Sequence, residues 1–105
     1  MWVFCKSGFF SAVEHREDAS LVMVRARFRG DLERFLKTHK IKAKVACTPG
    51  ADYKYRITIK KDEWSKAVSS EAEAIDYDNF KSSVHDGSGR DAAYLRCWAA
   101  LRTAQ

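Results

Sequence analysis

The chain has 105 residues, of which 46% are hydrophobic and 12% aromatic, and this content suits one domain with a single modest core. A content of one proline and five glycines argues against a disordered or low-complexity chain. No apolar run approaches the roughly 18 residues of a membrane span, and the apolar start reaches Lys6 too soon for a signal peptide. We therefore expect one globular domain over residues 1–105, in the cytoplasm and without a membrane partner.

The charge and the cysteines set further limits. Lysine and arginine outnumber the acidic residues by 19 to 14, and the resulting net charge of +5 permits binding to nucleic acid or to an acidic protein. The odd set Cys5, Cys47 and Cys97 lacks close spacing, so we expect reduced and mostly buried thiols. No cysteine or histidine pair has the short spacing of a structural zinc site, and we expect neither a metal nor a cofactor.

The first half of the chain alternates like a sheet. Residues 2–5 and 9–14 are apolar and aromatic around Lys6-Ser7-Gly8, which predicts a hairpin. In residues 21–29 apolar and basic side chains alternate, which predicts a strand with one core face and one basic face. A helix is then expected from an N-cap at Asp31 to Lys40.

The middle of the chain predicts a second hairpin. Apolar and polar side chains alternate in residues 41–47 and again in residues 53–60. Between them, the composition of Thr48-Pro49-Gly50-Ala51 is typical of a tight turn. Asp62 is expected to cap a second helix. Its sheet-facing positions are predicted to be Trp64, Ala67, Val68 and Ile75, with Ser69, Ser70, Glu71 and Glu73 outward.

The last third has helical spacing. Residues 75–81 are the expected transition, residues 85–89 break the chain, and a last helix is predicted over residues 90–103. Its predicted buried stripe consists of Tyr94, Leu95, Trp98 and Leu101.

These elements predict an α+β fold. The order β-β-β-α-β-β-α, followed by C-terminal helices, is similar to a ferredoxin-like split β-α-β-β-α unit. No closing strand follows the second helix, so we expect the N-terminal hairpin to occupy that edge. The prediction is an antiparallel sheet of about five strands with the long helices on one face.

The two best-patterned strands would place basic side chains together on the open face of the sheet. The candidate binding residues are Arg25, Arg27, Arg29, Lys54, Arg56 and Lys60. Guanidinium groups suit phosphates and carboxylates, so this face would receive an acidic protein or nucleoprotein surface, or a nucleic-acid backbone. The alternative interpretation is that these long side chains are merely solvated and guard against aggregation.

Base stacking on this face is not expected. A sheet that reads RNA displays aromatic side chains on its open face. Tyr53 and Tyr55 share a predicted face with Ile57 and Ile59, so we assign both tyrosines to the core. A lysine-rich run at residues 39–44 would only extend a basic surface.

The acidic residues of the last third do not predict an enzyme. Asp76, Asp78, Asp86 and Asp91 lie near expected helix starts, where capping explains them. His85 beside Asp86 lacks a nucleophilic partner in the sequence, and Cys97 is expected to be packed. We therefore expect no catalytic residue, although a minor alternative enzyme would use Asp76, Asp78 and His85.

Several motifs carry a resemblance. They are Gly50-Ala51-Asp52-Tyr53-Lys54-Tyr55-Arg56-Ile57, Ile75-Asp76-Tyr77-Asp78-Asn79-Phe80-Lys81, and Tyr94 with Trp98. Together they resemble a family of short uncharacterised proteins from bacteria and their phages and other mobile elements. The resemblance implies a bacterial or phage source but no activity, cofactor or catalytic residue.

Two functional hypotheses therefore lead. The first is a non-enzymatic binding module that contacts an acidic macromolecule through the basic open face. The second is a small protein-protein inhibitor of a host defence system, similar in role to an anti-CRISPR protein. That second protein would form a homodimer through the aromatic N-terminal hairpin or the last helix.

Overall fold

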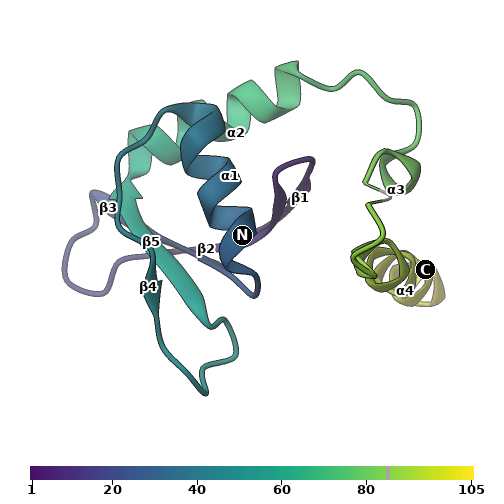
Figure 1. Cartoon of the computed structure of the whole chain (residues 1–105), viewed down its shortest axis with the longest axis horizontal. Helices are drawn as coiled ribbons and strands as arrows, with labels where there is room; N and C mark the ends of the chain where they lie inside the picture. The colour runs from purple at the N-terminus through teal and green to yellow at the C-terminus, as the bar shows by residue number, and fades with distance from the viewer. Residues whose placement is uncertain (85) are drawn as a thin grey trace. The chain divides into compact units, whose positions relative to one another are not determined.

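The computed structural model describes residues 1–84 and 86–105, which form two compact units, Met1–Ile75 and Asp76–Gln105. The elements can be followed by label in Figure 1. Unit 1 contains β1 (Trp2–Cys5), β2 (Gly8–Glu14), β3 (Leu21–Ala26), α1 (Arg29–His39), β4 (Ala46–Cys47), β5 (Tyr55–Lys60) and α2 (Lys61–Glu73). Unit 2 contains α3 (Phe80–Ser83) and α4 (Arg90–Thr103).

Unit 1 is built on an open five-stranded sheet in the order β1-β2-β3-β5-β4. Each neighbouring pair is antiparallel, and the N-terminal hairpin supplies the β1 edge. The predicted α+β fold and its antiparallel sheet are confirmed. The more detailed comparison with a ferredoxin-like unit stays a prediction.

The core covers only one face of this sheet. Phe10, Val24 and Ile57, on three neighbouring strands, are at most 1% exposed. The Phe35 ring of α1 lies 5.1 Å from the Phe10 ring and 5.7 Å from the Trp64 ring of α2. Both helices of unit 1 therefore bury their apolar stripes on the same side, and neither covers the opposite face.

The N-cap of helix α1 lies three residues earlier than predicted, and Asp31 has another role. Phe28 is the N-cap, and Asp31 lies inside the first turn with 1% of its surface exposed. Its carboxylate accepts hydrogen bonds from the Phe9 backbone N–H at 3.3 Å and from Arg34 at 2.6 Å. The positive end of the helix favours this negative charge, so Asp31 ties α1 to the hairpin instead of capping the helix.

A second buried polar contact ties α2 to its neighbours. Glu71, predicted to point outward, has a side chain only 12% exposed, accepts a hydrogen bond from the Ser7 hydroxyl, and lies 2.9 Å from Nε2 of His39. Burial raises the pKa of the nearby Cys5 thiol to about 11, and the Glu71 charge adds to the shift. The end of α2 is thus held to the β1–β2 turn and to the end of α1.

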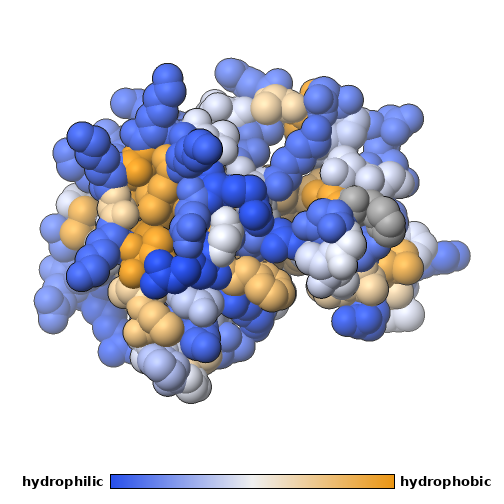
Figure 2. Space-filling model, viewed as in Figure 1, coloured by the Kyte–Doolittle hydropathy of each residue, from blue (hydrophilic) through white to orange (hydrophobic). Residues whose placement is uncertain are grey.

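The segment before β4 forms less strand than its alternation predicts. Only Ala46–Cys47 pair with β5, whereas Ile41, Ala43 and Val45 pack against the core without strand hydrogen bonding. Figure 2 shows a hydrophobic strip between hydrophilic side chains over this part of unit 1. The turn that follows is as predicted, because Ala51 N–H donates to the Thr48 carbonyl at 3.2 Å and Gly50 has a φ of 87°.

Helix α2 also differs from prediction at both ends. It begins at Lys61, and the Lys60 N–H donates to the Glu63 carboxylate at 3.0 Å, so Asp62 is not the cap. Trp64 faces the core as expected. Ile75 does not, because it lies beyond the end of the helix and is 56% exposed.

Unit 2 is small, and three aromatic rings in contact form its interior. The Phe80 ring lies 5.8 Å from both the Tyr77 and the Tyr94 rings, and Tyr94 is buried. Helix α4 has the predicted bounds, but its predicted buried stripe is wrong beyond Tyr94. The other three members are 46% to 74% exposed, namely Leu95, Trp98 and Leu101.

The helices of the described residues do not include one with both the length and the apolar character needed to cross a bilayer. The longest of them, α4, has 14 residues.

We predict that Gly8→Ala destabilises unit 1 by about 2 kcal/mol or more in urea unfolding. Gly8 has a φ of 145°, and an added Cβ would lie 2.7 Å from the Cβ of Asp31, so both strain and a steric clash oppose the side chain. Gly50→Ala is the matched control, because its φ of 87° is also positive but its Cβ would meet nothing within 4 Å. Equal losses in the two variants would contradict a role for the Asp31 contact.

Candidate binding surface on the open sheet face

Two arginines lie side by side on the face of the sheet opposite to α1 and α2. Arg25 of β3 pairs directly with Arg56 of β5 and with Ser11 of β2. Val24 and Ile57, their neighbours in sequence, are buried in the core, so alternation points both arginines to the other face. Directly opposed residues of an antiparallel pair have Cβ atoms about 4.5–5.5 Å apart.

Neither charge is neutralised within the described chain. Arg25 donates to the Ser11 hydroxyl at 2.8 Å, and Arg56 donates to the Tyr53 carbonyl at 3.3 Å. The Nε of each is buried and has no hydrogen-bond partner among the described residues, and no carboxylate there forms an ion pair with either group. Two half-buried like charges in direct opposition are unfavourable unless an anion joins them.

Tyr53 lies beside this pair. It is buried, as predicted, but it does not belong to the core cluster of Ile57, so the predicted face is wrong. Strand β5 begins only at Tyr55, so the chain before it does not continue the alternation. The Tyr53 ring lies 4.8 Å from the Arg25 guanidinium, 4.3 Å from that of Arg27, and 6.3 Å from the Phe9 ring. Tyr55, in contrast, packs against the core as predicted.

The N-terminal hairpin adds aromatic side chains to the same face. Trp2 pairs with Ser11 and Phe4 pairs with Phe9, while Phe10 points into the core. The Phe9 ring lies 5.9 Å from Trp2 and 4.5 Å from Phe4, and these two outer residues are 70% and 36% exposed. The two-residue period of the hairpin contains this signal, but sequence analysis did not place these rings beside the arginines.

A hollow of about 350 Å³ joins the two groups of side chains, and its lining is mixed. It is lined by Trp2, Arg25, Ala51, Asp52, Tyr53 and Arg56. Asp52 forms an ion pair with Arg27 at 2.8 Å and thereby raises the pKa of that guanidinium. We call Trp2, Phe4, Phe9, Arg25, Arg27, Tyr53 and Arg56 the open-face site.

Only three of the six predicted binding residues belong to this site. Arg25 and Arg56 form its centre, and Arg27 lies just beyond β3 at its rim. Lys60 shares the face but is four residues along β5 from Arg56, about 13 Å at the usual strand rise.

The remaining two lie elsewhere, beside Tyr55. Arg29 and Lys54 have their charged groups 5.6 Å and 5.7 Å from that ring. Arg29 belongs to α1 because the strand ends at Ala26, and it lies 3.9 Å from Glu33. The predicted row of basic residues is therefore divided between two places.

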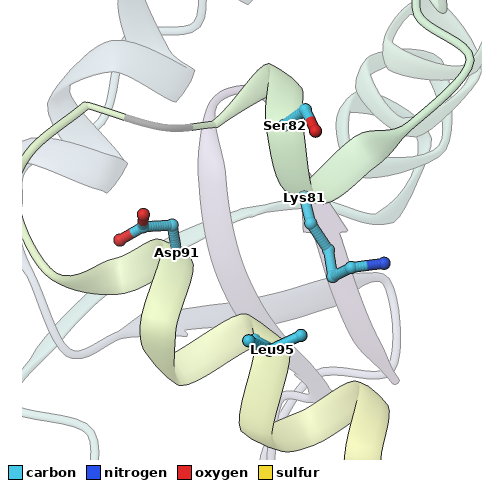
Figure 3. A pocket seen from close by; sticks show the side chains of 4 residues that line it. All are labelled: Lys81, Ser82, Asp91 and Leu95. Carbon is cyan, nitrogen blue, oxygen red and sulfur yellow. The ribbon is translucent and has the colours of Figure 1, made fainter.

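Unit 2 has a hollow of its own, about 430 Å³ in volume, between α3 and α4. Figure 3 shows that Lys81 and Ser82 come from one helix and Asp91 and Leu95 from the other. The charged ends of Lys81 and Asp91 point in different directions, and the Lys81 amine lies 5.0 Å from the Trp98 ring. The hollow does not bring reactive groups together.

The acidic residues of unit 2 were predicted to cap helices, and some of them do not. The side chain of Asn79 caps α3 by accepting from Ser82 N–H at 3.1 Å, so neither Asp76 nor Asp78 is its cap. Asp86 accepts from the hydroxyl and N–H of Ser88, which lowers the pKa of its carboxyl.

The alternative enzyme site consisted of Asp76, Asp78 and His85. His85 lies outside the described residues. Residues 1–84 and 86–105 contain no group of three or more histidine, cysteine or acidic side chains that could hold a metal ion.

The cysteines are free, and the prediction of mostly buried thiols is wrong. Cys5 is buried, whereas Cys47 and Cys97 are exposed. Cys97 is therefore not packed as expected.

Comparison of the chain with known protein families, with curated proteins and with solved structures found no match. The function must therefore be argued from the open-face site itself.

We predict that Arg56→Met reduces the salt-induced stabilisation of unit 1 by about 0.5 kcal/mol. Sodium chloride screens the repulsion between Arg25 and Arg56 in the natural chain, and the variant has no such repulsion to screen. Urea unfolding at low and high salt measures the difference. Lys60→Met is the control, since Lys60 lies on the same strand and face but opposite Leu21, and it should keep the natural salt response.

Proposed function

We propose that this chain is a non-enzymatic binding module that contacts an anionic macromolecular partner through the open-face site. The observation that carries the proposal is the opposed pair Arg25 and Arg56, which has no carboxylate partner in the described chain. An anionic group bound between the two guanidinium groups would offset their repulsion and supply the missing acceptors.

The setting of the pair supports binding more than catalysis. Arginine forks hold phosphate or carboxylate groups through paired hydrogen bonds, and a sheet fixes their spacing better than a loop does. Tyr53 stacks against Arg25 and Arg27 and restricts both side chains, which reduces the entropy lost on binding. We propose that the module acts in the cytoplasm of a bacterium, with a bacterial or phage origin.

Heparin provides a direct test of the site. We expect Arg25→Glu/Arg56→Glu to elute from a heparin column at much lower salt than the natural chain, because the anion contacts are lost. Circular dichroism and urea unfolding of each variant establish that the sheet is retained.

The matched control is Arg29→Glu/Lys54→Glu. Each pair of reversals removes four units of charge from the net charge of +5, leaving +1 in both variants. The control should elute close to the natural chain after allowance for its lower net charge. Identical elution of the two folded double variants would reject the open face as the anion site.

A second candidate function is a small interaction protein that inhibits a host defence system and self-associates. It is favoured by the edge strand β1, which carries Trp2 at 70% and Phe4 at 36% exposure. Exposed apolar side chains on a sheet edge are suited to pairing with a second copy of the chain.

If this second candidate is correct, multi-angle light scattering should give twice the chain mass of 12.0 kDa. Trp2→Glu should return the protein to a monomer, because the charge cannot be buried at the pairing edge. A monomer mass for the natural chain at high concentration would reject self-association.

A further inference from the structure

We infer that the partner of the open-face site is a single-stranded nucleic acid, with a base stacked on Trp2 and the adjoining phosphates on Arg25 and Arg56. This inference rests on the proposed function and names its partner. It reverses the expectation that the face carries no aromatic side chains, because the structure places Trp2, Phe4 and Phe9 there.

The strand register arranges the groups in a row. Trp2 pairs with Ser11, Ser11 with Arg25, and Arg25 with Arg56. Neighbouring strands are about 4.8 Å apart, so Trp2 lies two spacings, about 10 Å, from Arg25. A nucleotide stacked on Trp2 would hold its flanking phosphates within reach of the extended arginine side chains.

The exposure of the rings fits the stacking of bases. Trp2 is 70% exposed although it borders a hollow of about 350 Å³ that it shares with Arg25 and Arg56. Phe4 continues the surface, with its ring stacked 4.5 Å from that of Phe9. Flat aromatic side chains beside guanidinium groups that form no ion pair with the described residues provide the two contacts that a single strand needs, one for its bases and one for its backbone.

Other anionic partners match only part of the site. A duplex keeps its bases stacked inside and offers its backbone alone, so Trp2 and Phe4 would stay uncovered. An acidic peptide would satisfy the arginines but has no base to place on the indole. A single strand is the partner whose chemistry uses both halves of the site.

The site has few groups to read a particular base. The Ser11 hydroxyl is bonded to Arg25, and the Asp52 carboxylate is bonded to Arg27. Stacking and backbone contacts therefore dominate, and we expect little sequence preference. With Arg25 and Arg56 on phosphates, log affinity should fall with log salt at a slope of about −1.4.

The experiment is fluorescence anisotropy with labelled DNA and RNA strands of mixed sequence, about 12 nucleotides long. We expect both strands to bind and the corresponding DNA duplex to bind more weakly. Trp2→Ala should weaken single-strand binding about tenfold, and Trp2→Phe should restore most of it because the ring can still stack. Heparin has no bases to stack on Trp2, so each change should weaken strand binding by a larger factor than it weakens heparin binding.

The outcomes separate the partner from the site. If Trp2→Ala binds strands as the natural chain does, or if duplex and single strand bind equally, a single-stranded partner is overturned. The heparin result would then still support an anion site for a backbone or an acidic protein. If strand binding is equal in Arg25→Glu/Arg56→Glu and in Arg29→Glu/Lys54→Glu, the proposed function is overturned together with this inference. Trp2 is exposed on an edge strand, and urea unfolding of Trp2→Ala verifies that its fold is unchanged.

Discussion

The contact between Phe10 and Phe35 decides which face of the hairpin is inside, and the rest of unit 1 depends on that choice. Side chains along a strand alternate with a period of two, so burying Phe10 under α1 turns Phe9 to the opposite face. The hairpin register then carries Trp2 and Phe4 to that face too. A register shift of one residue would bring the outward side chains of the hairpin into the core and turn the core side chains outward. The packing of Phe10 therefore fixes both the interior and the candidate site.

This dependence explains how far the sequence could predict the fold and the site. The alternation around Val24 and Ile57 was sufficient to place Arg25 and Arg56 together, because both lie inside regular strands. The same rule failed for Tyr53, which precedes the first residue of β5 and contacts Arg25 of β3 and Arg27 just beyond that strand. Positions at the ends of elements follow turn geometry and tertiary contacts, and periodicity does not describe either of them.

Long-range polar contacts were beyond sequence analysis for a related reason. Glu71 occupies a helix position that reads as outward, yet it is held inside by Ser7 and His39 from two distant parts of the chain. Asp31 is of a residue type that often forms a helix N-cap, but its carboxylate accepts a hydrogen bond from the Phe9 backbone N–H instead. In both cases the local pattern predicted that a helix was present, but it did not predict the distant partner that holds the side chain. The open-face site combines the two situations, since the regular strands of its arginines were predictable and the loop of its tyrosine was not.

The close approach of Gly8 and Asp31 has an evolutionary consequence. The space that a side chain at position 8 would need is already filled by the carboxyl group of position 31. During evolution, Gly8 could be replaced by a larger residue only after Asp31 had been replaced by a smaller one. The loss of Asp31 would remove the acceptor of the Phe9 backbone N–H. Relatives of this chain should therefore change these two positions together or leave both alone.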